Sequence, residues 1–260
     1  MSDGDFTAAI VIIGNEILSG RTADQNTPWL AEKLNEYGIK LMEVRIVPDL
    51  PDMIAEAVND MRTRYNYVLT TGGIGPTHDD ITAAAIAHAF SVPLHEDPSA
   101  RQMLEDYYGT EELNTARLKM AVVPEGSVLI DNPVSGAPGF KIENVYVLAG
   151  VPRIMQSMVE SFVDGLAGGD PVLSNTITCD LLESQIADDL GKLQEKYTDV
   201  DLGSYPQYRG GILGLSIVLR TTEASQLQNA TQEVIALIEN LGGQAGAVTV
   251  RSDREKRNSA

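Results

Sequence analysis

The segment from Tyr67 to Phe90 constrains the fold more than any other part of the chain. A short apolar stretch, Tyr67–Thr71, leads into a turn with three glycines within four residues, and an alanine-rich stretch follows. Short, continuous apolar runs are typical of strands that are buried on both faces, as in parallel sheets. The stretch at 80–90 is apolar on all sides and predicts a buried helix. We therefore expect a strand–turn–helix unit of a parallel sheet.

Strand and helix patterns alternate along the first two thirds of the chain. They predict strands at 8–13, 40–47, 67–71 and 144–148, and helices at 26–37, 51–64, 80–90, 99–108, 111–120 and 152–166. Short turns that contain glycine connect these elements. Such alternation predicts a three-layer α/β/α domain with a mainly parallel sheet.

A second domain is predicted after a break rich in Gly and Pro at 167–171. The pattern there predicts strands at 172–179, 201–205, 213–221 and 245–250, with helices at 183–197 and 223–241. The resulting order, β-α-β-β-α-β, is typical of a small ferredoxin-like α+β domain. We therefore predict domains at 1–168 and 169–250, followed by a flexible tail at 251–260.

The charge of the chain limits its partners. Its 260 residues include 37 Asp and Glu against 19 Lys and Arg, which gives a formal net charge of −18. Nucleic acids and anionic membranes attract basic surfaces, so neither is an expected partner. The chain is nevertheless 43% hydrophobic, which is enough to build packed cores. An anionic ligand would need backbone N–H groups, helix N-termini or a metal ion to offset the acidic side chains.

Cysteine content and apolar runs bear on the compartment. The single cysteine, Cys179, rules out an intramolecular disulfide and is expected to be a buried apolar residue. No apolar run approaches the roughly 20 residues of a membrane span, and residues 1–7 lack the pattern of a signal peptide. These features favour a cytoplasmic protein.

The turn at 72–77 is also the strongest functional signal. It lies where a buried parallel strand is predicted to end, and open α/β sheets bind their ligands there. Gly72, Gly73 and Gly75 allow backbone N–H groups to approach an anion closely. The turn lacks the Lys-Ser/Thr pair of a P-loop. A plain β-α turn with an Asp N-cap is the alternative, but Thr77 and the acids that follow favour a ligand site.

Asp79 and Asp80 stand at the start of the next predicted helix. Two carboxylates would repel a phosphate unless a divalent cation bridged them to it, so the pair predicts a hard ion such as Mg²⁺. His78 is a candidate metal ligand or phosphate donor, and plain solvent exposure is the alternative. Of the other histidines, His88 is expected to lie in the core and His95 in a solvated loop.

Acidic residues also follow the two preceding strands, at the same predicted edge of the sheet. Glu16 is a candidate for binding a hydroxyl or a metal, and its alternative is a plain loop acid. Asp49 is a second candidate, and capping of the next helix is its alternative. The Gly/Pro turns at 136–139 and 150–152 are ordinary turns in the simplest interpretation.

These motifs resemble the MoaB/MogA-like molybdenum-cofactor biosynthesis family, and most closely the amino-terminal part of the CinA competence/damage-inducible family. The resemblance runs from Ala8 to about Leu166. Its segments lie at 14–20, 26, 47–49, 71–82, 124–126, 132–134, 137–140 and 150–152. The second domain, with its Gly-Ser-Tyr-Pro at 203–206, resembles the segment that follows in CinA and in the amino-terminal half of eukaryotic FAD synthases.

The resemblance implies a pocket for a phosphorylated pterin or nucleotide at the carboxyl ends of the strands. By position, Asp49 and Asp80 match the family's two functional aspartates. MogA-like members usually have a basic residue where this chain has Asp79, which favours the CinA-like alternative. With Asp79 included, these three aspartates are the expected metal ligands. The expected ligand-binding residues are Gly14, Glu16, Asn26, Thr71, Gly72, Gly73, Gly75, Thr77, His78, Thr82, Pro138, Gly139 and Gly150.

Three functions are compatible with this resemblance. CinA-like members are associated with metal-dependent pyrophosphatase action on dinucleotides of the ADP-ribose or FAD type, and we expect such a hydrolase here, with Mg²⁺, Mn²⁺ or Co²⁺. One alternative is a module that binds molybdopterin or a nucleotide without turnover. The other is a molybdopterin adenylyltransferase. The resemblance also favours a homo-oligomer that binds a phosphorylated small molecule.

Overall fold

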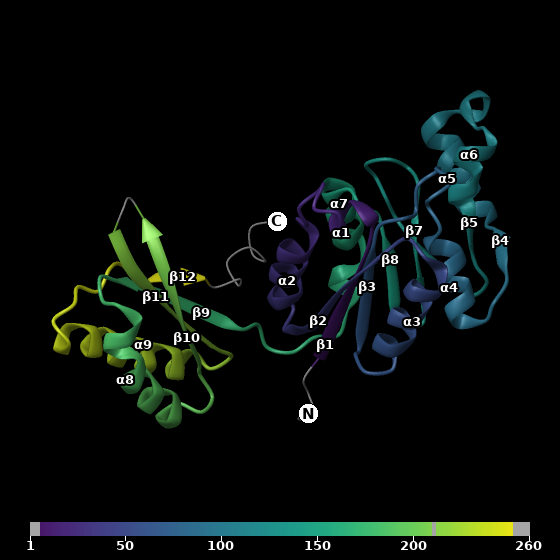
Figure 1. Ribbon diagram of the computed structural model, residues 1–260. Helices are drawn as coiled ribbons and strands as arrows, with labels where there is room; N and C mark the ends of the chain where they lie inside the picture. Colours follow the sequence, from purple (N-terminus) through teal and green to yellow (C-terminus); the bar gives the residue numbers. More distant parts are fainter. Residues whose placement is uncertain (1–5, 210–211, 252–260) are drawn as a thin grey trace. The chain divides into compact units, whose positions relative to one another are not determined.

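The computed structural model describes residues 6–209 and 212–251 (Figure 1). The chain divides between Gly169 and Asp170 into two units. Apart from Arg251, the predicted tail lies outside the described residues.

The first unit is built on a mainly parallel sheet with the strand order β2-β1-β3-β8-β7-β6. Its strands are β1 (Phe6–Ile13), β2 (Ile39–Val47), β3 (Tyr67–Thr71), β6 (Val128–Ile130), β7 (Gly139–Ile142) and β8 (Val145–Leu148). The neighbours β2, β1, β3 and β8 run parallel, and β7 runs antiparallel to both of its neighbours. The predicted parallel sheet is confirmed.

Alternate residues of β1 face opposite layers of the domain. Ala9, Val11 and Ile13 pack in one core cluster with α3 (Pro51–Arg62) and α4 (Thr82–Phe90). Ala8, Ile10 and Ile12 pack in a second cluster with α2 (Asn26–Glu36) and α7 (Pro152–Phe162). Figure 1 shows these two helix pairs on opposite faces of the sheet. Since both faces are covered, β1 contains almost only apolar residues, and the three-layer prediction is confirmed.

The region from 94 to 130 departs most from the prediction. Helix α5 (Pro98–Tyr108) agrees, with Asp97 accepting from the backbone N–H groups of Ser99 and Ala100. The helix expected at 111–120 is wrong, because the chain breaks there into short turns. They are η1 (Thr110–Glu112), α6 (Thr115–Leu118) and η2 (Lys119–Ala121). Asn114 caps α6 by accepting from the N–H of Arg117, which starts a new turn inside the expected helix.

Several short elements were not predicted. A two-stranded sheet pairs β4 (Leu94–Glu96) with β5 (Val122–Pro124). The strands β6 and β7 and the short helix α1 (Asn15–Leu18) are further examples. The helix predicted at 152–166 ends as α7 at Phe162 and continues as the turn η3 (Val163–Gly165). His95 lies in β4 rather than in a loop, but it is exposed as expected. The core position expected for His88 is wrong, since this side chain is exposed on α4 and its Nε2 lies 3.8 Å from Asp52.

The second unit has the predicted order β-α-β-β-α-β. Its elements are β9 (Leu173–Cys179), α8 (Glu183–Lys196), β10 (Asp201–Arg209), β11 (Ile212–Thr221), α9 (Ala224–Asn240) and β12 (Thr249–Arg251). The strands pair antiparallel in the order β10-β11-β9-β12. The last strand is shorter than predicted, although Ala245 forms an isolated bridge with Cys179.

The core of the second unit contains Cys179 together with apolar residues of both helices and the sheet. Burial raises the pKa of the Cys179 thiol, because the thiolate would be poorly solvated there. This agrees with its expected apolar role. Among the described residues, no helix is both long and apolar enough to cross a membrane.

Candidate functional site

The parallel strands of the first unit end together at one edge of the sheet, as expected. The residues that follow them include Gly14 after β1, Asp49 after β2, Gly72 after β3 and Gly150 after β8. Backbone hydrogen bonds join the strand ends. The N–H of Gly14 donates to the carbonyl of Val47 at 3.2 Å, and that of Gly72 donates to the carbonyl at the end of β8 at 3.1 Å.

The turn at 72–77, which we call the glycine loop, has two positions where a larger residue would clash with its neighbours. Gly72 has φ +107°, and a Cβ there would lie 2.2 Å from the carbonyl oxygen of Ile13. Gly73 has φ +68°, and a Cβ there would lie 2.3 Å from Thr82 Oγ1. The Thr82 hydroxyl donates to the Gly72 carbonyl at 2.8 Å, and the Thr82 N–H donates to the Gly73 carbonyl at 3.0 Å. Thr82 is fully buried, so it holds the loop in place from beneath.

Asn26 ties the start of α2 to the same edge. Its Nδ2 donates to the carbonyl of Gly150 at 2.9 Å, although the two residues are 124 positions apart in the sequence. Gly150 lies against the glycine loop, because a Cβ there would be 3.2 Å from the Cα of Gly72. The carbonyl of Gly150 can only accept, so the amide nitrogen of Asn26 must face it.

Several buried polar atoms at or next to this edge have no partner within the described chain. They include the Oδ1 of Asn26 and the Oγ1 of Thr71, and the hydroxyls of the neighbouring Thr27 and Thr70 are unpartnered as well. Thr71 is the last residue of β3, and its side chain points to the same sheet face as Leu69, which packs with α2 and α7. Buried polar atoms that lack a partner are unfavourable, so Asn26 Oδ1 and Thr71 Oγ1 favour a ligand that supplies hydrogen bonds there.

The side chain of Thr77 contacts the two acidic residues that follow the glycine loop. Its hydroxyl lies within hydrogen-bond distance of Asp79 Oδ1 and, at 2.6 Å, of Asp80 Oδ2. The hydroxyl has one proton and therefore donates to one carboxylate at a time. The Thr77 N–H also donates to Asp80 Oδ2 at 2.8 Å. The hydrogen bond from Thr77 is the largest factor that lowers the pKa of Asp79, because it stabilises the ionised carboxylate.

Lys119 is a site residue that no pattern in the sequence predicted. Its Nζ donates to the backbone carbonyl of Thr77. With Asp80 and Pro138, it lines a small pocket of about 90 Å³ beside the stretch from Gly73 to Gly75. The contact spans 42 residues, and no local motif around Lys119 indicates it.

The other predicted residues lie at or near the edge with simpler contacts. Asp49 Oδ2 accepts from the N–H of Asn15 at 2.9 Å, which caps the short helix α1. Glu16 is exposed, and its carboxylate lies over Gly14. The His78 side chain is 98% exposed, with Nδ1 3.8 Å from Asp79 Oδ1. Gly139 serves strand packing, because a Cβ there would lie 2.4 Å from the carbonyl of Val147.

The oxygen donors at this edge suit a hard cation that a substrate helps to hold. No group of three or more His, Cys, Asp or Glu residues in the described ranges is arranged to bind a metal, so Asp49 does not complete one with Asp79 and Asp80. Those two carboxylates and the Thr77 hydroxyl nevertheless form a compact set of oxygens. Mg²⁺ is often held by one or two carboxylates together with substrate phosphates, and this set fits that mode.

The close approach at Gly72 predicts a large cost for adding a side chain. We expect Gly72→Ala to lower the free energy of unfolding by about 3–4 kcal/mol, from the positive φ and the clash with the Ile13 carbonyl. Gly20→Ala is the matched control, because Gly20 also has positive φ but has open space around it. It should cost about 1–2 kcal/mol. Urea unfolding followed by Trp29 fluorescence measures both, and equal costs would contradict the steric account.

The Thr77 hydroxyl also predicts a titration shift. In Thr77→Val, the pKa of Asp79 should rise toward the ordinary aspartate value of about 3.9, whereas Thr77→Ser should retain the lowered value. Because the folded-state pKa is below the unfolded one, the ionised carboxylate stabilises the fold above about pH 3.9. That contribution is lost as the pH falls through the folded-state pKa. Carboxyl NMR titration gives both values, and an unchanged pKa in Thr77→Val would refute the assignment.

Each of the two units matches a known protein family. Residues 9–169 match the family described as "Probable molybdopterin binding domain", and residues 171–242 match "FAD synthase, middle domain". A protein of Archaeoglobus fulgidus is 36% identical over 198 residues, which cover 76% of this chain and 85% of that protein. A "Probable FAD synthase" of Caenorhabditis briggsae is 32% identical over 265 residues, which cover 91% of this chain. The chain spans 50% of that relative's length.

The solved structure of CinA from Thermoplasma acidophilum, a protein described as having unknown function, is also similar. It has a TM-score of 0.59 and 32% sequence identity, and the match covers 62% of this chain and 98% of that one. The chain therefore belongs to the family defined by the probable molybdopterin binding domain, and its first domain is MoaB/MogA-like and similar to CinA.

Proposed function

We propose that the first domain hydrolyses the pyrophosphate bond of a dinucleotide of the ADP-ribose or FAD type, with a divalent cation. The observation that carries this proposal is the pair of carboxylates, Asp79 and Asp80, held on the Thr77 hydroxyl beside the glycine loop. Two anions gathered next to a phosphate-sized turn are unfavourable unless a cation joins them when the ligand binds.

Each residue at the edge has a part in this proposal. The backbone from Gly73 to Gly75 borders the pocket and binds a phosphate. Asp79 and Asp80 hold the cation, which, when bound, supplies charge neutralisation and activates water for attack on phosphorus. Lys119 adds positive charge at the same pocket.

The nucleoside part of the ligand is proposed to lie toward α2. Asn26 Oδ1 and Thr71 Oγ1 are buried there without partners in the structure described, and Asn26 is fixed by its bond to Gly150. A ribose hydroxyl or a base amine donates to Asn26 Oδ1 in this arrangement, which removes the cost of an unpaired acceptor. The similarity to a "Probable FAD synthase" and to the family "FAD synthase, middle domain" also supports a nucleotide ligand.

Binding without turnover is the second candidate function. It is favoured by the contact of Asp49 with the Asn15 N–H, since a carboxylate that caps α1 is less available to a metal. In that case, the glycine loop and Asn26 would bind molybdopterin or a nucleotide, and the acids would only cap backbone groups.

We also propose that the protein acts as a homo-oligomer in the cytoplasm. Strand β2 lies at the edge of its sheet. It exposes Val44 and Ile46 on one face, each 40% exposed, and Met42, which is 51% exposed, at the irregularity in its pairing with β1. Alternate apolar residues on an edge strand are costly in water unless another surface covers them. A chain with a single cysteine fits a reducing compartment.

Turnover assays separate the two candidate functions. Purified protein should release mononucleotides from ADP-ribose or FAD with Mg²⁺, Mn²⁺ or Co²⁺, and chelation should stop the reaction. Asp80→Asn should reduce turnover by about 100-fold or more while keeping dinucleotide binding, because the amide oxygen can still accept from Thr77. Asp52→Asn is the matched control, since this exposed acid lies on α3, and it should retain full activity.

Absence of turnover with every metal would contradict the proposed hydrolase activity. Binding without turnover would then remain as the candidate function. Unchanged turnover in a folded Asp80→Asn variant would contradict the role assigned to Asp80 in metal binding. Calorimetry with ADP-ribose, alongside the activity assay, gives both quantities for each variant.

A further inference from the structure

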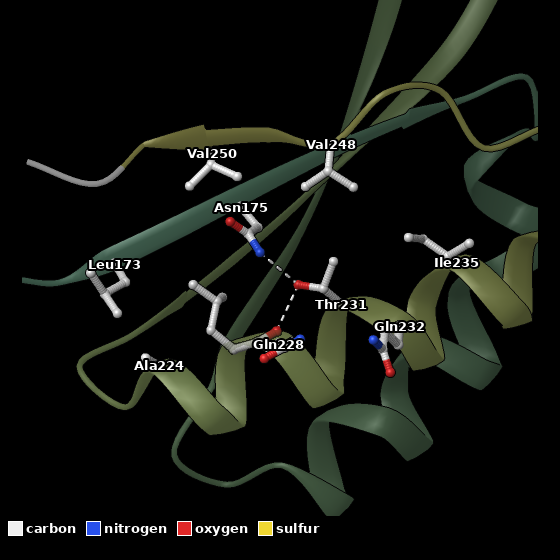
Figure 2. Close-up of a pocket in the computed structure, with 10 residues that line it drawn as sticks. Leu173, Asn175, Ala224, Gln228, Thr231, Gln232, Ile235, Val248 and Val250 are labelled. Atoms are coloured by element: carbon white, nitrogen blue, oxygen red, sulfur yellow. Dashed lines mark hydrogen bonds between the residues drawn. The ribbon is translucent and has the colours of Figure 1, made fainter.

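The second domain contains a pocket that the proposed function does not use. Its volume is about 410 Å³, and it lies between α9 and the strands β9 and β12 (Figure 2). Leu173, Leu227, Ile235, Val248 and Val250 provide its apolar walls. None of the described residues that line it is charged, although the chain as a whole carries −18. Its size is within the range of small-molecule sites.

Two consecutive buried hydrogen bonds connect β9 to α9 among the residues that line this pocket. The hydroxyl of Thr231 donates to the carbonyl of Leu227 at 2.6 Å, as in many helices that contain threonine. The hydroxyl proton is therefore engaged, and Thr231 Oγ1 can only accept from Asn175 Nδ2, which lies 2.9 Å away. This fixes the orientation of the Asn175 amide, because the opposite orientation would place two acceptors against each other.

The carbonyl oxygen of Asn175 is left without a partner. Asn175 is only 8% exposed, and its Oδ1 is buried with no hydrogen-bond partner among residues 6–209 and 212–251. Figure 2 shows this oxygen directed away from Thr231, on the side of Leu173 and Val250, which both line the pocket. A buried acceptor of this kind favours a ligand that donates to it.

We propose that this pocket binds an uncharged, planar heteroaromatic ring that donates a ring N–H to Asn175 Oδ1. Apolar walls suit the faces of such a ring, and the single acceptor fixes its edge. Gln228 and Gln232, exposed on successive turns of α9 at the rim, supply adaptable hydrogen bonds to the ring's outer edge.

Other ligand classes fit less well. A phosphate or carboxylate would enter a pocket whose described lining offers no cation. An alkyl chain would fill the apolar space but would leave Asn175 Oδ1 unpaired. The ring proposed here carries no charge and supplies a donor to Asn175 Oδ1. This proposal is independent of the nucleotide site proposed for the first domain.

The test uses two fluorescent probes that differ in one donor. Lumiflavin is uncharged and has a single ring N–H, and 3-methyllumiflavin has that hydrogen replaced by a methyl group. We expect saturable binding of lumiflavin to the full chain and about ten-fold weaker binding of the methylated probe. Fluorescence titration and equilibrium dialysis measure both affinities.

Matched tryptophan variants locate the binding. Ala224 lines the pocket and is exposed, so Ala224→Trp should fill the space and weaken lumiflavin binding at least ten-fold. Gln228→Trp provides a second blocking variant in case the first fails to fold. Ala236→Trp is the control, because Ala236 is exposed on the same helix and does not line the pocket. It should bind like the unchanged chain.

The proposal would be overturned by absence of saturable lumiflavin binding, by equal affinity for the two probes, by binding unaffected by either blocking variant, or by binding seen only when the chain is cut after Arg251. Excess ADP-ribose should leave lumiflavin binding unchanged. Competition between them would place lumiflavin in the first domain and would also contradict the proposal, whereas failure of dinucleotide turnover alone would leave it standing.

Discussion

The backbone contacts of Gly72 set the geometry on which the first domain depends. Its N–H donates to Leu148, a Cβ would strike the carbonyl of Ile13, and Gly150 approaches its Cα. The ends of β1, β3 and β8 therefore converge in a space that only glycine leaves open. Thr82 holds the glycine loop that follows β3 through a hydrogen bond to the Gly72 carbonyl. The positions of the Asp79 and Asp80 carboxylates therefore depend on how the strand ends pack.

The candidate site of the first domain contains charged side chains, whereas the described lining of the larger pocket in the second domain does not. At the sheet edge, Asp79 and Asp80 share one hydroxyl, and Lys119 lies beside them, so ionic chemistry is concentrated at an exposed loop. In the second domain, the described lining of the larger pocket is neutral, and its one unsatisfied acceptor is the Asn175 carbonyl. A metal-bound phosphate suits the first environment, and an uncharged ring edge suits the second.

The sequence predicts what burial dictates and misses what distant contacts create. Strands β1 and β3 are covered on both faces, so their apolar runs indicated a parallel sheet directly. The three-residue strands β4 and β5 are too short to show a period, and Asn114 interrupts a stretch that otherwise reads as a helix. The bond of Asn26 to Gly150 spans 124 residues, so local patterns could nominate Asn26 but could not reveal its unpaired oxygen.

We propose that the glycine loop, with the carboxylates of Asp79 and Asp80, binds a phosphate together with a divalent cation. Anomalous diffraction from crystals grown with Mn²⁺ and ADP-ribose tests it most directly. We expect manganese density in contact with Asp79 and Asp80, and a phosphate against the backbone from Gly73 to Gly75. Manganese bound elsewhere, or a dinucleotide ordered away from this edge of the sheet, would contradict it.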